Sequence, residues 1–148
     1  MAPILIDTNL LIYLFDHNQP DRQSRAMDVL NQLELMGLGR LSVQNLAEFF
    51  IVSTRKLLPP LSPKEALEQV NLFTRIWPVF DLTPLIVLEA ARGVRDYQMS
   101  YDDAQIWATA HLNQISVIFS EDLNVGASLE GVQFINPFSP EFVLDNWV

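Results

Sequence analysis

Short apolar runs alternate with longer amphipathic segments along the chain, and this alternation is the main structural signal in the sequence. The short runs are rich in β-branched and aromatic residues, which predicts five β-strands over residues 4–6, 40–43, 79–82, 116–119 and 132–135. The longer segments predict helices over residues 10–15, 21–36, 46–58, 63–77, 84–97 and 100–114, followed by a short closing helix from Ser139. This order favours an α/β fold with a parallel sheet covered by helices on both faces.

Several helix boundaries can be predicted from residue types alone. Asn45 is a suitable N-cap for the helix over 46–58, and the proline pair at 59–60 ends that helix because proline disfavours helical geometry in the residue before it. Ser62, Pro63 and Glu65 form a capping-box pattern at the start of the next helix.

The composition is that of one folded domain over residues 1–148, with 49% hydrophobic and 18% charged residues and no repeat or linker. The absence of cysteine excludes a disulfide, a thiolate nucleophile and a cysteine-type zinc site. The N-terminus has no basic leader pattern, and no apolar run approaches the length that crosses a bilayer. We therefore expect a cytoplasmic protein without a membrane partner.

The net charge of −9 argues against broad coating of a nucleic acid, because a phosphate backbone meets net repulsion unless basic residues cluster locally. An acidic surface fits a basic partner protein, but it also serves solubility, which is the more common reason for it. Charge alone does not choose between these two interpretations.

Acidic residues follow or flank the predicted strands at positions that belong to one edge of the sheet. Asp7 follows the first strand, Glu48 lies in the first turn of the helix after the second strand, and Asp122 follows the fourth. Asp102 and Asp103 open a helix. In an open α/β sheet, ligands bind in the crevice beyond the carboxyl ends of the strands, so these acids are expected to meet there.

Carboxylates that are brought together repel one another and raise each other's pKa, unless a cation lies among them. Oxygen ligands without cysteine or paired histidines favour Mg²⁺, with Mn²⁺ as a substitute, over structural zinc. Such an ion suits the hydrolysis of phosphodiesters. Taken singly, each acid also has a structural interpretation: Asp102 and Asp103 as helix-start charges, and Glu48 as a surface acid. Asp7 differs, because a carboxylate that ends an apolar strand is costly to bury without partners.

Four segments strengthen the hydrolase interpretation by their order and spacing. They are "ILIDTNLLIY" at 4–13, "QNLAEFF" at 44–50, "YDDAQIWATA" at 101–110 and "FSEDL" at 119–123. Together they resemble the PIN domain, especially the VapC-like toxin nucleases of type II toxin-antitoxin pairs. The resemblance implies a three-layer α/β/α sandwich with a central, mostly parallel, five-stranded sheet.

The resemblance also implies residue roles. The Mg²⁺ ligands and catalytic acids would be Asp7, Glu48, Asp103 and Asp122, with Asp103 rather than Asp102 matching the family pattern. Asp102 departs from that pattern and has no assigned role. Thr8, Asn9 and Ser120 resemble the small polar neighbours that orient acids or waters.

The implied activity is that of a Mg²⁺-dependent endoribonuclease, in which water activated by the ion attacks the RNA phosphodiester and leaves a 5′-phosphate and a 3′-hydroxyl. The implied partners are an RNA substrate, a cognate antitoxin protein and a second copy of the chain. Four basic residues could contact phosphate, although a solvated helix face is the better explanation for each of them: Arg22, Arg25, Arg55 and Lys56. His17 and His111 lack the spacing of a ligand pair and are interpreted as incidental.

Three alternative functions would each require a different set of residues. A phospho-receiver domain has the same fold class, but requires a lysine after its last strands, and the only lysines are Lys56 and Lys64. A phosphatase of the haloacid dehalogenase type requires a second aspartate two residues after the first, where this chain has Asn9. The third alternative is a catalytically silent PIN-fold binding module, which has little physical reason to keep four repelling carboxylates together.

Overall fold

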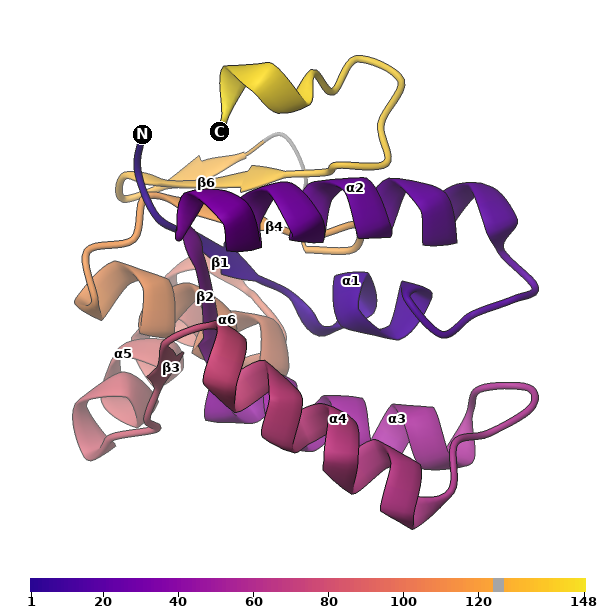
Figure 1. Ribbon diagram of the computed structural model, residues 1–148. Coiled ribbons are helices and arrows are strands. Elements are labelled where there is room, and N and C mark those ends of the chain that lie inside the picture. The colour runs from indigo at the N-terminus through magenta and orange to yellow at the C-terminus, as the bar shows by residue number, and fades with distance from the viewer. Residues whose placement is uncertain (124–126) are drawn as a thin grey trace.

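The computed structural model describes residues 1–123 and 127–148, which form three layers, with helices on both sides of a central sheet (Figure 1). The strands are β1 (Ile4–Ile6), β2 (Gly39–Ser42), β3 (Val79–Phe80), β4 (Val117–Phe119), β5 (Ser128–Leu129) and β6 (Val132–Ile135). The helices are α1 (Thr8–Tyr13), α2 (Pro20–Met36), α3 (Val43–Arg55), α4 (Pro63–Ile76), α5 (Pro84–Tyr97) and α6 (Tyr101–Leu112), with a 3₁₀ helix, η1, at Leu144–Asn146. The predicted α/β architecture is confirmed.

The sheet has the strand order β3-β2-β1-β4-β6-β5. All neighbouring strands are parallel except β5, which is antiparallel to β6. The chain moves outward from β1 through β2 to β3, and then returns to the other side of β1 with β4. The carboxyl ends of β1 and β4 therefore flank the point where the strand order reverses, which is where open α/β sheets bind ligands.

Alternation along the strands explains why helices cover both faces. Ile4 and Ile6 belong to one hydrophobic core, which also takes buried side chains from α1, α2, α3 and α4. Leu5 points to the opposite face and joins a second core with α5 and α6, where Trp107 is fully buried. Successive side chains of a strand face opposite sides, so a strand that is apolar throughout requires cover on both.

The helix ends agree in part with the predicted boundaries. Ser62 and Glu65 form the predicted capping box at the start of α4, with Pro63 at the first helical position. The prediction of Asn45 as N-cap is wrong, because α3 begins earlier and Ser42 caps it, with Asn45 at the third helical position. Glu48 consequently lies in the second turn of α3 rather than in the first.

Two further predictions about the end of the chain need correction. The sheet has six strands rather than five, because Ser128–Leu129 pairs with β6 through a tight turn that holds Gly131 at a φ of 84°. The closing helix from Ser139 is absent among the described residues except for η1. Instead, Phe142 and Trp147 pack edge-on against Phe119 of β4. This aromatic contact favours an irregular path over a regular helix.

Glycine is required at position 39, because β2 and the end of α4 lie very close together there. A Cβ atom on Gly39 would lie 2.4 Å from Nε1 of Trp77, the residue that ends α4. Only glycine therefore lets α4 and β2 approach this closely. None of the helices in the described parts of the chain meets the length and hydropathy that a bilayer-spanning helix needs.

Candidate functional site

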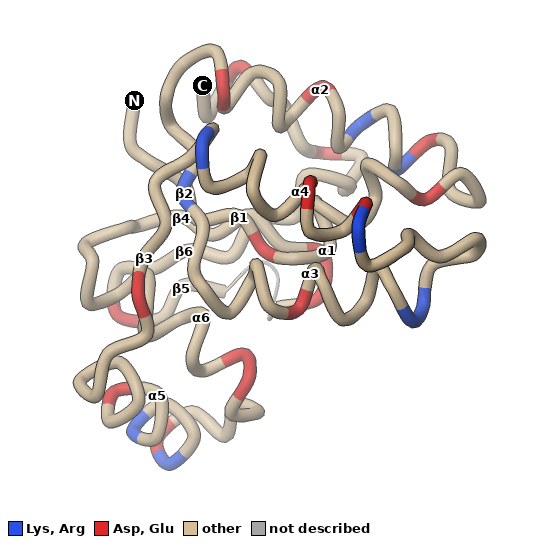
Figure 2. Tube along the Cα trace, turned by 60° about the horizontal axis from the view of Figure 1, so that its bottom comes forward, with Lys and Arg blue, Asp and Glu red and all other residues tan. Residues whose placement is uncertain are grey.

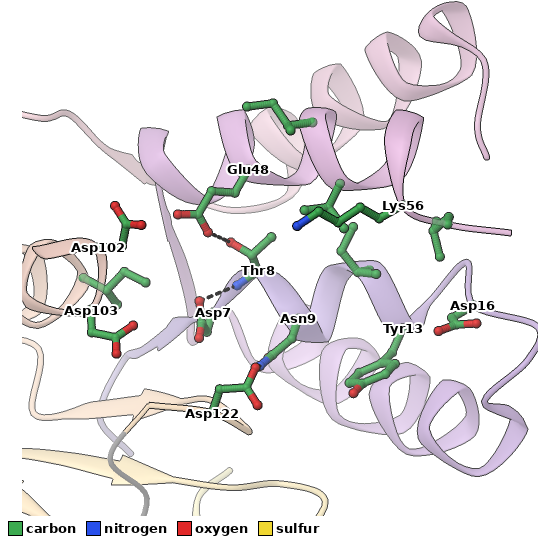
Figure 3. A pocket seen from close by; sticks show the side chains of 15 residues that line it. Asp7, Thr8, Asn9, Tyr13, Asp16, Glu48, Lys56, Asp102, Asp103 and Asp122 are labelled. Carbon is green, nitrogen blue, oxygen red and sulfur yellow. Dashed lines mark hydrogen bonds between the residues drawn. The ribbon is translucent and has the colours of Figure 1, made fainter. Parts of the chain in front are cut away.

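A cavity of about 660 Å³ opens at the carboxyl edge of the sheet, beside β1 and between α1, α3 and α6. Figure 2 places acidic positions near the start of α1, on α3 and at the start of α6, around this region. The residues that line the cavity include all four predicted ligand acids and three of the supporting residues: Asp7, Glu48, Asp103, Asp122, Thr8, Asn9 and Asp102. The structure thus brings together acids that are spread over most of the chain (Figure 3).

Asp7 is held at the base of the cavity by two hydrogen bonds. It caps the N-terminus of α1, where its Oδ1 accepts from the backbone N–H of Thr8 at 2.7 Å. Its Oδ2 accepts from the hydroxyl of Ser120 at 2.7 Å. The side chain is only 8% exposed. Each carboxylate oxygen still has a lone pair that is not used by these bonds, so Asp7 retains the capacity to bind a cation.

The environment of Asp7 opposes its negative charge. Burial raises the pKa of Asp7 from its ordinary value of 3.8 to about 6, although the hydrogen bonds from Ser120 and Thr8 lower it. The nearby charges of Glu48 and Asp103 raise this pKa further. A carboxylate that is disfavoured in this way gains most from a bound cation, because the cation reverses the sign of the local field.

Glu48 is oriented by a chain of buried polar groups. The hydroxyl of Thr8 donates to Oε2 of Glu48 at 2.9 Å, and Nδ2 of Asn45 donates to the same hydroxyl at 3.2 Å. Oδ1 of Asn45 accepts in turn from the backbone N–H and the hydroxyl of Ser42. This network links the end of β2 to α1, and it fixes both the rotamer of Thr8 and the position of Glu48.

Two glutamines that were not singled out from the sequence connect α3 to α6. Nε2 of Gln44 lies 3.1 Å from Oε1 of Glu48 and 3.0 Å from the backbone oxygen of Asp102, and donates to both. Gln105 donates to Oε1 of Gln44 at 3.0 Å. Gln44 lies four positions before Glu48 in the sequence. Side chains at this spacing meet along a helix, so the contact between Gln44 and Glu48 could have been predicted.

The start of α6 carries the acid pair. Ser100 caps the helix by accepting from the backbone N–H of Asp103 at 3.3 Å. Asp103 is half-buried and lies close enough to influence Asp7, whereas Asp102 is exposed. Figure 3 draws both side chains on the side of the cavity opposite Lys56. Of the two acids, Asp103 is therefore the one whose charge affects Asp7.

The turn after β4 positions the fourth acid. Oδ2 of Asp122 accepts from Nδ2 of Asn9 at 3.2 Å. Ser120 is fully buried, and its hydroxyl oxygen accepts from the backbone N–H groups of Asp122 and Leu123 while it donates to Asp7. One serine therefore ties the ends of β1 and β4 together, which makes Ser120 a supporting residue although it does not line the cavity itself.

The donor set fits a hard divalent ion by its chemistry. All four acids offer oxygen ligands, and Oδ1 of Asn9 is buried without a hydrogen-bond partner in the described parts of the chain. Among residues 1–123 and 127–148, however, no three Asp, Glu or His side chains stand in a ready-made metal-binding arrangement. The carboxylates must therefore rotate inward for one ion to be shared.

The remaining candidates divide between the cavity and the surface. Lys56 and Tyr13 line the cavity, whereas His17, His111, Arg25 and Arg55 do not. Arg22 lies at its margin, where Nε is 2.6 Å from Oε2 of Glu121. Burial raises the pKa of Tyr13 to about 12, and the hydrogen bond that its hydroxyl donates to Glu121 acts in the same direction. His111 contacts Glu89, far from the cavity lining.

The PIN domain family model matches residues 4–126 of the chain. Among solved structures, a toxin-antitoxin complex from Klebsiella pneumoniae has a TM-score of 0.67 at 18% identity and covers 93% of this chain and 98% of that chain. The toxin VapC20 of Mycobacterium tuberculosis, described as cleaving the sarcin-ricin loop, has a TM-score of 0.65 at 17% identity, with 86% and 97% covered.

A DNA-bound VapBC complex from Salmonella typhimurium also has a TM-score of 0.65 at 17% identity and covers 93% of this chain and 99% of that chain. No curated protein matches the chain significantly. At these identities the structural similarities establish a shared fold only.

Proposed function

The chain belongs to the PIN domain family, and from this premise and the acids of the cavity we propose that it is a Mg²⁺-dependent endoribonuclease. The observation that carries the proposal is the convergence of Asp7, Glu48, Asp103 and Asp122 on one cavity at the switch point of the sheet. The four carboxylates that line this cavity repel one another, and a bound cation would offset that repulsion.

The residues of the chain have distinct tasks in this proposal. Asp7, Glu48, Asp103 and Asp122 would hold the ion. When bound, Mg²⁺ lowers the pKa of water and stabilises the negative charge that develops at a cleaved phosphodiester. Thr8 and Gln44 hold Glu48 at the cavity through hydrogen bonds, and Ser120 holds Asp7 there.

RNA as substrate, rather than a small phosphodiester, is supported by the description of VapC20, which has the same fold, as a toxin that cleaves the sarcin-ricin loop. Thr8, Asn9 and Ser120 are positioning residues in this scheme. Asp102 exposes its carboxylate at the cavity margin and has no assigned step.

We further propose that the protein acts as the toxin of a type II toxin-antitoxin pair and forms homodimers. One solved structure with this fold is described as a toxin-antitoxin complex from Klebsiella pneumoniae, and another as VapBC-1 from nontypeable Haemophilus influenzae. A basic segment of an antitoxin would complement the net charge of −9 and the acids of the cavity. An adjacent gene for a small protein with a DNA-binding head would support the pairing, and its co-expression should relieve growth arrest by this chain.

The test of the nuclease incubates purified protein with mixed cellular RNA and Mg²⁺, alongside an EDTA control, Asp7→Asn and the surface variant Lys64→Ala. The proposal expects cleavage by the wild type and by Lys64→Ala, and none with EDTA or Asp7→Asn. Cleavage that persists in Asp7→Asn contradicts the assigned mechanism. Failure to cleave any RNA at any protein concentration favours a PIN-fold binding module instead.

A further inference from the structure

One side of the cavity carries a positive charge in surroundings that are otherwise acidic. Among the residues that the structure describes, Lys56 is the only lysine or arginine that lines the cavity, which it shares with Asp16, Glu48 and the acids at the other end. In Figure 3 its side chain follows the wall formed by α3, and its nitrogen is directed toward the interior of the cavity. Its role is not explained by the acids that would hold Mg²⁺.

The sequence places Lys56 in register with Glu48. Glu48, Val52 and Lys56 are spaced at intervals of four residues, so they follow one another along one face of α3. Eight residues of helix separate the backbones of Glu48 and Lys56 by about 12 Å. The backbone of Lys56 therefore lies two turns of helix beyond Glu48, a spacing that suits a phosphate farther along the strand than the one at the acids.

The backbone at Lys56 is fixed by the fold. Its N–H donates to the carbonyl of Val52 as the C-cap of α3, and the neighbouring Leu57 is buried. The loop that follows is joined to the segment before α2 by a hydrogen bond from Asn18 to the carbonyl of Leu58 at 2.8 Å. The ammonium is thus presented from a defined position, although the side chain itself is exposed.

Lys56 does not act as a simple partner for the nearby acids. It forms no ion pair with any carboxylate in the described parts of the chain, whereas Arg22, Arg92 and Arg95 are each paired with one. An exposed, unpaired ammonium beside an aliphatic wall of Ile12, Ile51 and Val52 is suited to an anion that comes from outside.

We propose that the Lys56 ammonium binds a non-scissile backbone phosphate of the RNA, a few nucleotides along the strand from the bond cleaved at the acids. This inference rests on the proposed nuclease function and adds the residue that attracts the strand. Because the protein has a net charge of −9, a polyanion requires such a local contact to enter the cavity. Contact with the phosphate backbone does not depend on the base sequence, so Lys56 should contribute affinity rather than sequence specificity.

The test compares Lys56→Ala and Lys56→Arg with the wild type in steady-state cleavage of a single-stranded RNA oligonucleotide at several salt concentrations. Lys64→Ala is the matched control, because Lys64 is the other lysine of the chain and is exposed on α4. We expect Lys56→Ala to raise KM about tenfold, with kcat changed less than about twofold. The slope of log(kcat/KM) against log salt should become shallower by about 0.7.

Lys56→Arg should restore KM and the salt slope because it keeps the charge, and Lys64→Ala should alter neither. An unchanged KM and salt slope in Lys56→Ala would overturn the inference. So would a fall in kcat at constant KM, since that pattern belongs to a group that acts only in the chemical step. Thermal melts of all variants exclude a general loss of structure as the cause.

A binding measurement separates this inference from the nuclease proposal. Fluorescence anisotropy with labelled single-stranded RNA compares Asp7→Asn with the double variant Asp7→Asn/Lys56→Ala, so that no cleavage is required. An affinity about tenfold weaker in the double variant supports the assignment of Lys56 even if the wild type cleaves nothing. Equal affinities overturn it even if the wild type is an active nuclease.

Discussion

Replacement of Asp7 by asparagine should stabilise the ion-free protein while it abolishes activity. Burial of Asp7 disfavours its charged form, and the rise of its pKa from 3.8 to about 6 measures the penalty at neutral pH. At about 1.36 kcal/mol for each pH unit, the penalty is roughly 3 kcal/mol. Asparagine is neutral and of nearly the same shape, so Asp7→Asn removes this penalty.

The gain is reduced by the hydrogen bonds around residue 7. Asp7 accepts one bond at each oxygen, from Thr8 and from Ser120, whereas asparagine has only one accepting oxygen. The hydroxyl of Ser120 already accepts from two backbone N–H groups, so it offers little to an asparagine NH₂ group. One lost bond costs about 1–2 kcal/mol, which leaves a net stabilisation of about 1–2 kcal/mol. For a chain of this size the melting temperature should rise by about 3–6 °C.

The effect should depend on pH with a defined sign. Because the pKa of Asp7 is raised in the folded state, its protonation stabilises the wild type fully below about pH 4, and this stabilisation is lost as the pH rises through about 6. Asp7→Asn does not titrate at this position. Its advantage over the wild type should therefore be present at pH 7.5 and absent at pH 4.

The assay is thermal unfolding in EDTA at both pH values, repeated at pH 7.5 with added Mg²⁺, with the exposed substitution Asp28→Asn as control. Mg²⁺ should raise the melting temperature of the wild type and of Asp28→Asn but not that of Asp7→Asn, because a ligand that binds only the folded state stabilises it. An Asp7→Asn protein that is less stable than the wild type at pH 7.5 in EDTA would refute the reasoning about burial and repulsion.

Three other substitutions test the supporting structure. Ser120→Ala removes the hydroxyl that joins Asp7 to the turn after β4, and should lower the free energy of unfolding in urea by roughly 2 kcal/mol; no change would mean that water replaces the hydroxyl. Thr8→Val removes the hydrogen bond to Glu48 and should lower kcat/KM for RNA cleavage about 10- to 100-fold. Thr8→Ser keeps the hydroxyl, so its kcat/KM should remain near that of the wild type. Equal kcat/KM values for the two variants would exclude this positioning role. Gly39→Ala places a Cβ against Trp77 and should destabilise the protein by about 1–3 kcal/mol in the same urea assay, and an unaffected midpoint would contradict the close approach.

The layers of the fold and the positions of the acids could be predicted because both follow from local pattern. The apolar runs around Leu5 and Ile118 indicate strands buried on both faces, and the order of strands and helices then leaves few topologies. Asp7 directly follows β1, and Asp122 lies in the turn after β4, so their placement at the carboxyl edge required no knowledge of side-chain contacts.

The contacts between distant elements could not be predicted in this way. The hydrogen bond from Gln105 to Gln44 spans 61 positions of the sequence, and nothing in either helix indicates the other. Asn45 was interpreted as a helix cap because asparagine favours that position locally, but the hydroxyl of Thr8 gives it a buried partner instead. The small strand β5 was missed because a two-residue run carries no periodicity.

The place of Lys56 in the acid cavity also could not be predicted from the sequence. In the sequence it resembles any solvated lysine at the end of a helix, and its spacing from Glu48 acquires meaning only when α3 is seen to form a wall of the acid cavity. The net charge of the chain is a weaker guide to RNA binding than the position of individual basic residues. An acidic chain can still place one cation where a strand of RNA would enter.

The central claim, that the acids share one ion, is tested most directly by a crystal structure of the wild type grown with Mn²⁺, with anomalous scattering used to locate the metal. The account predicts an anomalous peak in the cavity, within about 2.0–2.3 Å of oxygens from Asp7 and from at least one of Glu48, Asp103 and Asp122. The side chains should have rotated inward relative to the arrangement described above. A fully occupied metal elsewhere, with the four carboxylates still apart and the cavity without a peak, would contradict the account.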